Sequence, residues 1–307
     1  MRGFTDANVP DQSGKTFIVT GANTGIGFEI ANALAARRAR VLLACRDEAK
    51  AEAAIGQIRR KTPGADLAFL PLDLADLASV RNAVKLAEKE PRIDVLINNA
   101  GVQGSELKRT KQGFEQTFGV NHLGCFAFTC LLLPKLAETP ESRVVVTSSG
   151  LHRDATIDWD DLNAEKSFQW LSRYSNSKLA NLLFVFELDR RLRGAGVPVT
   201  AVACHPGLAG TELGRSSAMG KMVMPLVGLL LNTPAMGAWG ALHAATGEVK
   251  PGGYYGSKGL RELRGPSYEC FPAERARDPQ SAKRLWDVSV QMTGIDPELP
   301  SNSDHQG

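Results

Sequence analysis

The chain lacks the features that would indicate nucleic acid or a membrane as its partner. Its formal net charge is only +3, and its 307 residues contain no dense Lys/Arg block with interleaved aromatic residues, so nucleic acid is not expected. No uninterrupted apolar run reaches the roughly 18 residues of a membrane-spanning helix. Residues 1–13 are polar and contain Pro10, without the apolar core of a signal peptide. We therefore expect neither a leader nor a membrane anchor.

Cysteine is scarce, and its placement favours neither disulfides nor a metal. The five cysteines are odd in number and scattered: Cys45, Cys125, Cys130, Cys204 and Cys270. This usage is typical of reduced thiols in a cytoplasmic protein. Four of the five histidines, His122, His152, His205 and His243, are equally dispersed, without ligand spacing. We expect no metal site. His152 and His205 could face a substrate, although we favour a structural role for both.

What the sequence does contain is an alternation of short apolar segments with helical patterns. With 43% hydrophobic and 22% charged residues, the composition is that of a soluble globular protein. Six segments are interpreted as strands, at residues 15–20, 40–44, 66–72, 93–97, 143–147 and 198–203. Their alternation with helices predicts an α/β fold, a doubly wound parallel sheet covered on both faces. We expect one domain over residues 14–296, with flexible segments at 1–13 and 297–307.

Each predicted strand is followed by small or polar residues. These clusters begin at Gly21, Cys45, Asp73, Asn98, Ser148 and Cys204. Turns are often polar, which explains any one cluster but not all six together. Ligands of open parallel sheets bind at the carboxyl ends of the strands, so we place the function at this edge.

Residues 21–27, which read Gly-Ala-Asn-Thr-Gly-Ile-Gly, lie between the first predicted strand and its helix. Glycines in this context permit a tight turn, and the amino end of the helix offers free N–H groups to a pyrophosphate. The residues expected to bind the cofactor there are Gly21, Asn23, Thr24, Gly25, Ile26 and Gly27. A P-loop is excluded, because no Gly-Lys-Ser/Thr follows.

The end of the second strand bears on the choice of dinucleotide. NAD sites place an acid there for the ribose hydroxyl, whereas this chain has Ala44-Cys45-Arg46. A guanidinium suits a phosphate, so Arg46 favours NADP(H) over NAD(H), with Asp47 directly after it as the opposing feature. Asp73, followed by Leu74, could accept a hydrogen bond from the adenine amino group or cap a helix, and both roles remain open.

Tyr174 and Lys178 lie four residues apart in a long apolar helical pattern, and therefore share one helix face. A free phenol, with a pKa of about 10, is a poor base at neutral pH. A nearby ammonium favours the phenolate and lowers this pKa. The pair could then relay a proton in alcohol–carbonyl chemistry. A Tyr-x-x-x-Lys spacing alone also arises by chance.

Together these motifs resemble the short-chain dehydrogenases/reductases. The residues that carry the resemblance, between about Gly14 and Gly294, are Thr20-Gly21-x-x-x-Gly25-x-Gly27, Asn98-Asn99-Ala100-Gly101, Asn121, Ser149, Tyr174-x-x-x-Lys178 and His205-Pro206-Gly207. The retinol-dehydrogenase-like group is most similar, through Ala44-Cys45-Arg46-Asp47, Asn176-Ser177-Lys178 and Arg284-Leu-Trp286. The resemblance implies a single-domain Rossmann fold with a seven-stranded, mostly parallel sheet.

The resemblance also implies roles for individual residues. Tyr174 would be the proton donor or acceptor, and Ser149, rather than Ser148, would hold the substrate oxygen. Lys178 would also bind the nicotinamide ribose, and Asn121 would complete a water-linked proton path to it. The remaining residues implied to line the cofactor are Asn99, Ala100, Gly101, Pro206, Gly207 and Thr211.

Residues 212–233 correspond to the variable substrate lid of that family. Their Met and Leu content indicates a hydrophobic ketone, aldehyde or alcohol as substrate. Contact of this lid with a membrane is not expected, because its polar face is thin. The helix of Tyr174 is apolar over more than one face, which in the family often serves a homodimer or homotetramer. Two alternatives to alcohol–carbonyl chemistry stay open: reduction of a C=C bond, and a nucleotide-binding regulator without turnover.

Overall fold

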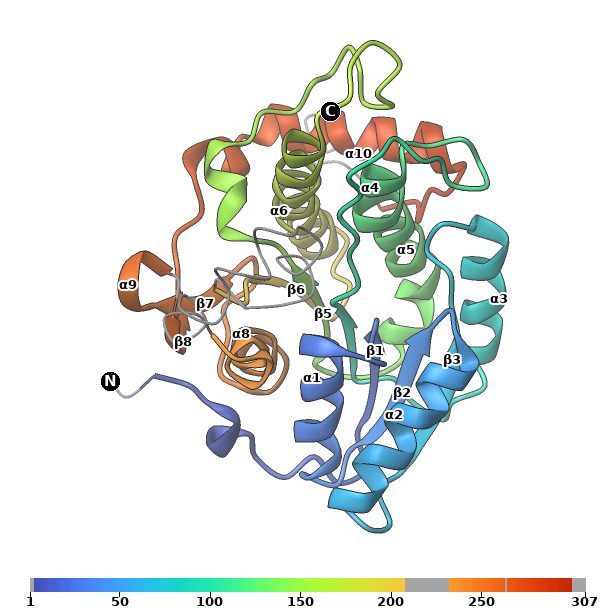
Figure 1. Cartoon of the computed structure of the whole chain (residues 1–307), viewed down its shortest axis with the longest axis vertical. Coiled ribbons are helices and arrows are strands. Elements are labelled where there is room, and N and C mark those ends of the chain that lie inside the picture. Colours follow the sequence, from blue (N-terminus) through green and yellow to red (C-terminus); the bar gives the residue numbers. More distant parts are fainter. Residues whose placement is uncertain (1–2, 208–231, 263, 300–307) are drawn as a thin grey trace.

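A computed structural model of the protein describes residues 3–207, 232–262 and 264–299. Its centre is a sheet with the strand order β3-β2-β1-β4-β5-β6-β7-β8 (Figure 1). The strands are β1 (Thr16–Thr20), β2 (Arg40–Cys45), β3 (Leu67–Pro71), β4 (Val95–Asn98), β5 (Ser142–Thr147), β6 (Val199–Cys204), β7 (Tyr254–Lys258) and β8 (Arg264–Glu269). All pairs are parallel except β7 with β8. The predicted doubly wound parallel sheet is confirmed.

The described sheet has eight strands, one more than the seven expected. The additional strand, β8, runs antiparallel at the edge of the sheet. Only the short helix α9 (Gly259–Glu262) separates it from β7. Because a parallel connection needs a crossover of a dozen or more residues, so short a link can only return the chain antiparallel.

Helices cover both faces of the sheet, as Figure 1 shows. One face carries α1 (Gly25–Ala35), α2 (Glu48–Lys61) and α8 (Pro234–Thr246), and the other carries α3 (Leu77–Ala87), α5 (Cys125–Ala137) and α6 (Trp170–Gly194). Side chains of β1 alternate between them: Ile18 packs with the α3, α5 and α6 face, and Phe17 and Val19 pack with the other. The carboxyl ends of the parallel strands therefore meet at one edge.

The amino-terminal segment is docked, in contrast to the flexible segment expected over residues 1–13. Phe4 exchanges two backbone hydrogen bonds with Ser267 of β8, both of 2.8 Å, and its ring stacks on His243 at 4.6 Å between centroids. After the short helix η1 (Asp6–Asn8), Val9 and Gln12 are each only 2% exposed. The polar composition of residues 1–13 gives no sign of this docking, because the partner of Phe4, Ser267, is distant in sequence. Of the expected tail at 297–307, residues 300–307 lie outside the described residues.

The carboxy-terminal helix α10 (Pro279–Thr293) lies against α6 (Figure 1). Trp286 of α10 is 3% exposed and contacts Phe126 of α5 and Phe184 of α6, with ring centroids 5.2 and 6.0 Å apart. Part of the second apolar face of α6, which suggested a dimer interface, is thus buried within the chain itself. An oligomer would need surface that α10 leaves uncovered.

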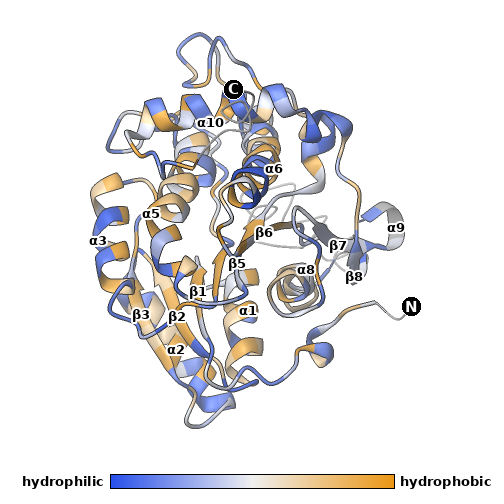
Figure 2. Ribbon diagram, turned by 180° about the vertical axis from the view of Figure 1, so that it is seen from behind, coloured by the Kyte–Doolittle hydropathy of each residue, from blue (hydrophilic) through white to orange (hydrophobic). Residues whose placement is uncertain are grey.

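One stretch, Gln116–Ala137, is long and apolar enough by composition to span a membrane, with a mean hydropathy of 1.3. It comprises α4 (Gln116–Phe118), the π-helical turn η2 (Gly119–Gly124) and α5. In the structure 89% of its most apolar window of 18 residues is buried, and Figure 2 shows the apolar helix α5 within the body of the fold. It is a core helix of the α/β domain.

Candidate active site

The glycine turn between β1 and α1 has the conformation that its sequence predicts. Gly21 and Gly25 have φ values of +67° and +58°, a region that glycine adopts without strain. A Cβ at Gly27 would lie 2.3 Å from the carbonyl oxygen of Gly21, so only glycine permits this close packing. Among the residues that the structure describes, no atom lies within 4 Å of a Cβ built on Gly25. The amino end of α1 is therefore accessible to a phosphate, and the turn fits a dinucleotide.

The end of β4 is fastened to the end of β1 through Thr20. The Thr20 hydroxyl accepts hydrogen bonds from the backbone N–H groups of Asn99 and Ala100, at 3.0 and 2.9 Å. The Asn99 side-chain amide donates to the Thr20 carbonyl at 3.0 Å. Sequence reasoning gave Thr20 no role, because its partners are some eighty residues distant. This linkage places residues 99–101 beside the glycine turn.

Arg46 follows β2 and is exposed, whereas Asp47 is engaged. The Asp47 carboxylate caps α2 by accepting from the Lys50 N–H at 3.0 Å and lies 3.4 Å from the Lys50 ammonium. The hydrogen bond from the Lys50 backbone lowers the pKa of Asp47. Within the described part of the chain, Arg46 has no hydrogen bond or ion pair. Asp47, the acid that argued against NADP(H), is thus engaged at the amino end of α2. The exposed guanidinium of Arg46 is available to bind a phosphate.

Asp73 follows β3, but it does not cap α3. Its carboxylate accepts from the backbone N–H of Ala75 at 2.9 Å, while Asp76 caps the helix by accepting from Ala78 at 3.0 Å. Of the two roles considered for Asp73, helix capping is wrong, and a turn takes its place. The next residue, Leu74, packs under η2: a Cβ at Gly124 would lie 2.4 Å from the Leu74 carbonyl oxygen.

Where the reaction is expected, the Ser149 hydroxyl interacts with the Tyr174 phenol and lowers its pKa in part. It also accepts weakly from the Leu151 N–H, at 3.3 Å. The neighbouring Ser148 is 1% exposed and donates its hydroxyl proton to the Lys178 carbonyl at 2.8 Å. Strand alternation separates the two serines in this way. Of the two serines, Ser149 is the one that interacts with the phenol, and its role toward a substrate stays a prediction.

The Lys178 ammonium is 3% exposed and donates to the Thr147 carbonyl at 3.2 Å. It lies over the Tyr174 ring, 5.5 Å from the centroid. A Cβ at Gly101 would be 3.3 Å from Lys178 Nζ and 3.4 Å from Asn121 Oδ1. Glycine at position 101 thus lets the loop after β4 approach both polar groups closely.

The pKa values of the pair differ from the sequence expectation. Burial raises the pKa of Tyr174 to about 12, and the hydrogen bond from Ser149 lowers it only in part. Burial also lowers the pKa of Lys178 to about 8. The expected lowering of the Tyr174 pKa by Lys178 is therefore wrong for this structure. Burial is the largest influence on the Tyr174 pKa, and it exceeds the opposing influence of Ser149.

Asn121 lies in the π-helical turn η2 and connects two segments of the site. Its Oδ1 accepts from the Val102 N–H at 2.7 Å, and its Nδ2 donates to the Val102 carbonyl at 2.9 Å and to the Ser177 hydroxyl at 3.0 Å. Ser177 in turn donates to the Tyr174 carbonyl at 2.7 Å. Asn121 thus joins the loop after β4 to the helix of Tyr174. Single-turn π-helices are frequent at functional sites.

Pro206 and Gly207 follow β6, and Gly207 has a φ of +69°. The Pro206 carbonyl accepts from the Asn232 side chain at 2.8 Å, and Gly207 donates its N–H to His205 Nδ1 at 3.2 Å. Thr211 and residues 212–231 of the expected lid lie outside the described residues, so only positions 232 and 233 of that segment are described.

His152 and His205 are both buried, with 0% and 1% exposure. His152 Nδ1 contacts the Ser149 carbonyl at 2.6 Å, and its Nε2 accepts from the Ala273 N–H at 3.1 Å. His152 therefore supports the backbone of Ser149 from behind. Within residues 3–207, 232–262 and 264–299, no group of three or more His, Cys, Asp or Glu side chains is arranged to hold a metal ion.

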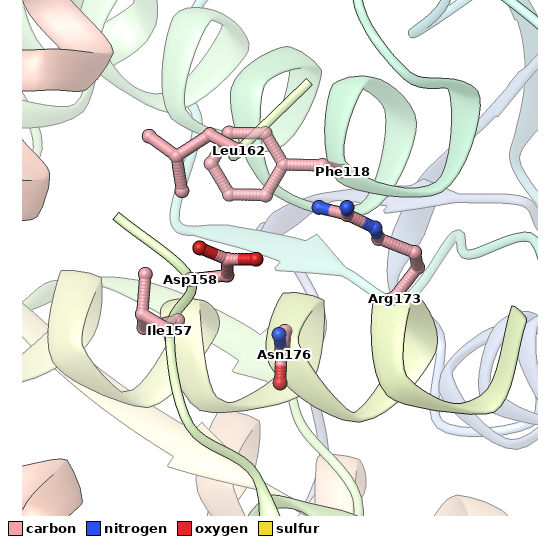
Figure 3. A pocket seen from close by; sticks show the side chains of 6 residues that line it. All are labelled: Phe118, Ile157, Asp158, Leu162, Arg173 and Asn176. Atoms are coloured by element: carbon pink, nitrogen blue, oxygen red, sulfur yellow. The ribbon is translucent and has the colours of Figure 1, made fainter. Parts of the chain in front are cut away.

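A small pocket lies beside α6, away from the polar groups described above. Figure 3 shows its lining side chains, which are Phe118, Ile157, Asp158, Leu162, Arg173 and Asn176. Arg173 is occupied there by an ion pair of 2.8 Å with the buried Asp161. Tyr174, Lys178 and Ser149 do not line this pocket, and the chemistry belongs to the sheet edge instead.

Known proteins match the chain over most of its length. It is 42% identical to human retinol dehydrogenase 14, over 92% of this chain and 87% of that protein, and 43% identical to human retinol dehydrogenase 13, over 94% and 86%. A crystal structure of an uncharacterised protein from Mycobacterium paratuberculosis is 38% identical and superposes with a TM-score of 0.81, covering 97% of this chain and 100% of that one.

A second solved structure, a short chain dehydrogenase from Burkholderia cenocepacia in complex with NADP, is 25% identical with a TM-score of 0.61, over 79% of this chain and 95% of that one. The family described as short chain dehydrogenase matches residues 15–221. The chain is therefore a member of the short-chain dehydrogenase/reductase family, similar to the retinol dehydrogenases.

Proposed function

We propose that this protein is an NADP(H)-dependent oxidoreductase that interconverts a hydrophobic alcohol and its ketone or aldehyde, with Tyr174 as the proton donor or acceptor. The observation that carries the proposal is the position of the buried Lys178 ammonium over the Tyr174 ring, 5.5 Å from its centroid, with Ser149 interacting with the same phenol. These groups belong to α6 and to the carboxyl end of β5, next to the glycine turn of α1. A proton donor, an oxygen-binding hydroxyl and a cation are thus gathered at one sheet edge.

Each residue at the carboxyl edge of the sheet has its own role in the proposed reaction. The nicotinamide, when bound, supplies or accepts the hydride. The Ser149 hydroxyl holds the substrate oxygen, and Tyr174 donates a proton to that oxygen or removes one in the reverse direction. The Lys178 ammonium stabilises the phenolate that remains after donation. Asn121, through Val102 and Ser177, keeps the proton path to Lys178 in place.

Three features favour NADP(H) as the cofactor. The exposed Arg46 can bind a ribose phosphate, and Asp47 is occupied by α2. A solved relative at 25% identity is described as an NADP complex. The pyrophosphate would bind over residues 21–27, with Asp73 and Leu74 near the adenine. Asn99, Ala100, Gly101, Pro206, Gly207 and Thr211 would line the nicotinamide end, and Lys178 would also bind its ribose.

An apolar substrate agrees with the names of the relatives, which are retinol dehydrogenases, and with the Met- and Leu-rich segment at 212–233. We propose a cytoplasmic location, since the five cysteines are all buried and free.

A substrate panel tests the proposal. Decanal, 2-decanone, all-trans-retinaldehyde and their alcohols are incubated with NADPH, NADH, NADP⁺ or NAD⁺, and the nicotinamide absorbance is followed. We expect turnover of at least one apolar carbonyl or alcohol, faster with the phosphorylated cofactor. Tight NADPH binding without turnover of any compound would contradict the proposal and favour a nucleotide-binding regulator. Turnover of an enone at its C=C bond alone would favour the double-bond reductase.

A further inference from the structure

The π-helical turn η2 carries two consecutive buried side chains that contact different parts of the fold. Asn121 bonds to Val102 and Ser177 of the active site. His122, 0% exposed, bonds through Nε2 to the hydroxyl of Ser289 on α10 at 2.8 Å. One turn thus links the catalytic edge of the sheet with a helix near the end of the described chain.

Glycines fix the backbone at both ends of this turn. A Cβ at Gly119 would lie 2.5 Å from Thr110 Cγ2, and one at Gly124 would lie 2.4 Å from the Leu74 carbonyl oxygen. The turn is therefore pressed against two neighbouring segments. Between Gly119 and Gly124, the rotation of the turn about its own axis depends on the contacts of its side chains.

The chemistry of Ser289 assigns the direction of its bond with His122. The Ser289 hydroxyl donates its single proton to the Leu285 carbonyl at 2.7 Å, so it accepts from His122 Nε2–H. The imidazole is neutral, because burial lowers the pKa of His122 to about 3. Its ring packs against Phe118, Phe126 and Phe184, with centroids 5.1, 6.3 and 6.1 Å away. Among the described residues, the bond to Ser289 is the one hydrogen bond of the His122 ring, which lies inside an aromatic cage.

We propose that His122 and Ser289 are positioning residues: their hydrogen bond holds the π-helical turn in the rotation that directs Asn121 at Val102 and Ser177. A relaxation toward regular α-helix would rotate side chains around the axis, since successive residues differ by about 100°. Asn121 would then lose its bonds to the loop beside Lys178. The inference rests on the proposed function, and it makes α10 part of the catalytic apparatus.

Two variants remove the bond, and a third serves as a matched control. His122→Phe keeps an aromatic ring in the cage but has no N–H donor, and Ser289→Ala removes the acceptor. Thr293→Ala deletes another buried hydroxyl of α10, which donates to the Ser289 carbonyl at 2.7 Å and does not touch His122. Thermal unfolding establishes that each variant folds. If His122→Phe fails to fold, the comparison of Ser289→Ala with Thr293→Ala tests whether the bond to His122 positions the turn.

The direct readout is hydrogen exchange of the Val102 amide, which donates to Asn121 and needs no substrate to be measured. We expect this amide to exchange faster in His122→Phe and Ser289→Ala and at the wild-type rate in Thr293→Ala. With decanal and NADPH, kcat should fall roughly tenfold or more in the first two variants, since positioned proton transfer contributes about 10²–10⁴-fold. KM for NADPH should change little.

Wild-type Val102 exchange in His122→Phe and Ser289→Ala, equal acceleration in Thr293→Ala, or an unchanged kcat would overturn the inference. If the wild-type protein turns over no compound of the panel, the proposed function fails instead. The exchange rates alone then decide whether the bond positions Asn121.

Discussion

The Ser148 hydroxyl donates a hydrogen bond to the backbone carbonyl of Lys178 at 2.8 Å, and so fastens the end of β5 to the first turns of α6. Both residues are almost fully buried, with 1% and 3% exposure. This bond fixes the register in which the next serine, Ser149, meets Tyr174. The serine that is not expected to touch the substrate thereby sets the geometry of the one that is.

Tyr174→Phe should abolish turnover while leaving NADPH binding intact. The substitution removes the phenolic proton but keeps the ring against which Lys178 lies. The kcat with the best panel substrate and the Kd for NADPH, from nicotinamide fluorescence, check this. A loss of roughly 10²–10⁴-fold in kcat is expected for a general acid or base. Near wild-type activity would eliminate Tyr174 as the proton donor.

Arg46→Ala should weaken NADPH far more than NADH. The Arg46 guanidinium is exposed and has no ion-pair partner in the described part of the chain, so its removal costs little in stability. The Kd values of both cofactors are compared with those of Arg60→Ala, which removes an exposed charge from the distant end of α2. Equal losses for NADPH and NADH in Arg46→Ala would remove the basis for naming NADP(H).

Lys178 should contribute stability that rises with pH between about 8 and 10. Burial lowers the pKa of Lys178 to about 8, whereas the unfolded chain binds this proton up to about pH 10.4. The unfolded side chain therefore holds the proton in this window, and deprotonation in the folded state favours folding by about 3 kcal/mol. The five buried cysteines oppose this rise, because burial raises their thiol pKa values and only the unfolded thiols ionise. Above about pH 10 Tyr174 adds to the fall, because its folded pKa is about 12 and only the unfolded phenol ionises.

Denaturant unfolding across this pH range provides the measurement. The free energy of unfolding of the wild-type protein minus that of Lys178→Met should rise with pH between about 8 and 10, and the same difference for Tyr174→Phe should fall above about pH 10. A difference for Lys178→Met that does not change with pH would show that Lys178 does not titrate in this window.

Trp286→Ala should destabilise the fold by about 3–5 kcal/mol, the usual cost of truncating a buried aromatic side chain. Trp286 packs on Phe126 and Phe184, and the Arg191 guanidinium lies 4.4 Å from its ring centroid. Urea unfolding measures the change against Lys283→Ala, on the half-exposed side of α10. A change no larger than that of the control would mean that α10 packs only loosely on α6.

The sequence was most informative where short-range physics decides the outcome. The bounds of α2 at Glu48 and Lys61 follow from the local sequence, because Asp47-Glu48 begins the helix and Thr62-Pro63-Gly64 ends it. The six strands were found because their apolar runs are continuous. Tyr254–Lys258 and Arg264–Glu269 were not recognised, since each mixes glycine, polar and charged residues and becomes a strand only through its neighbours.

In the candidate site, too, features set by local sequence could be predicted, whereas features set by distant contacts could not. Its residues could be predicted from spacing and resemblance, but the pKa of Tyr174 could not, because burial depends on the assembled fold. The docking of Asp47 on α2 follows from local capping rules. In contrast, the bond between His122 and Ser289 spans 167 residues, and no local pattern announces it.

The position of α10 in the chain has a consequence for synthesis. Residues 279–293 leave the ribosome after every other residue of the described site. Until then Trp286 cannot cover Phe126 and Phe184, and Ser289 cannot meet His122. The nascent domain can form its sheet and its nucleotide turn early, while an aromatic surface on α5 and α6 remains open to chaperones. The contacts of α10 are therefore made only after the sheet and the nucleotide turn have been synthesised.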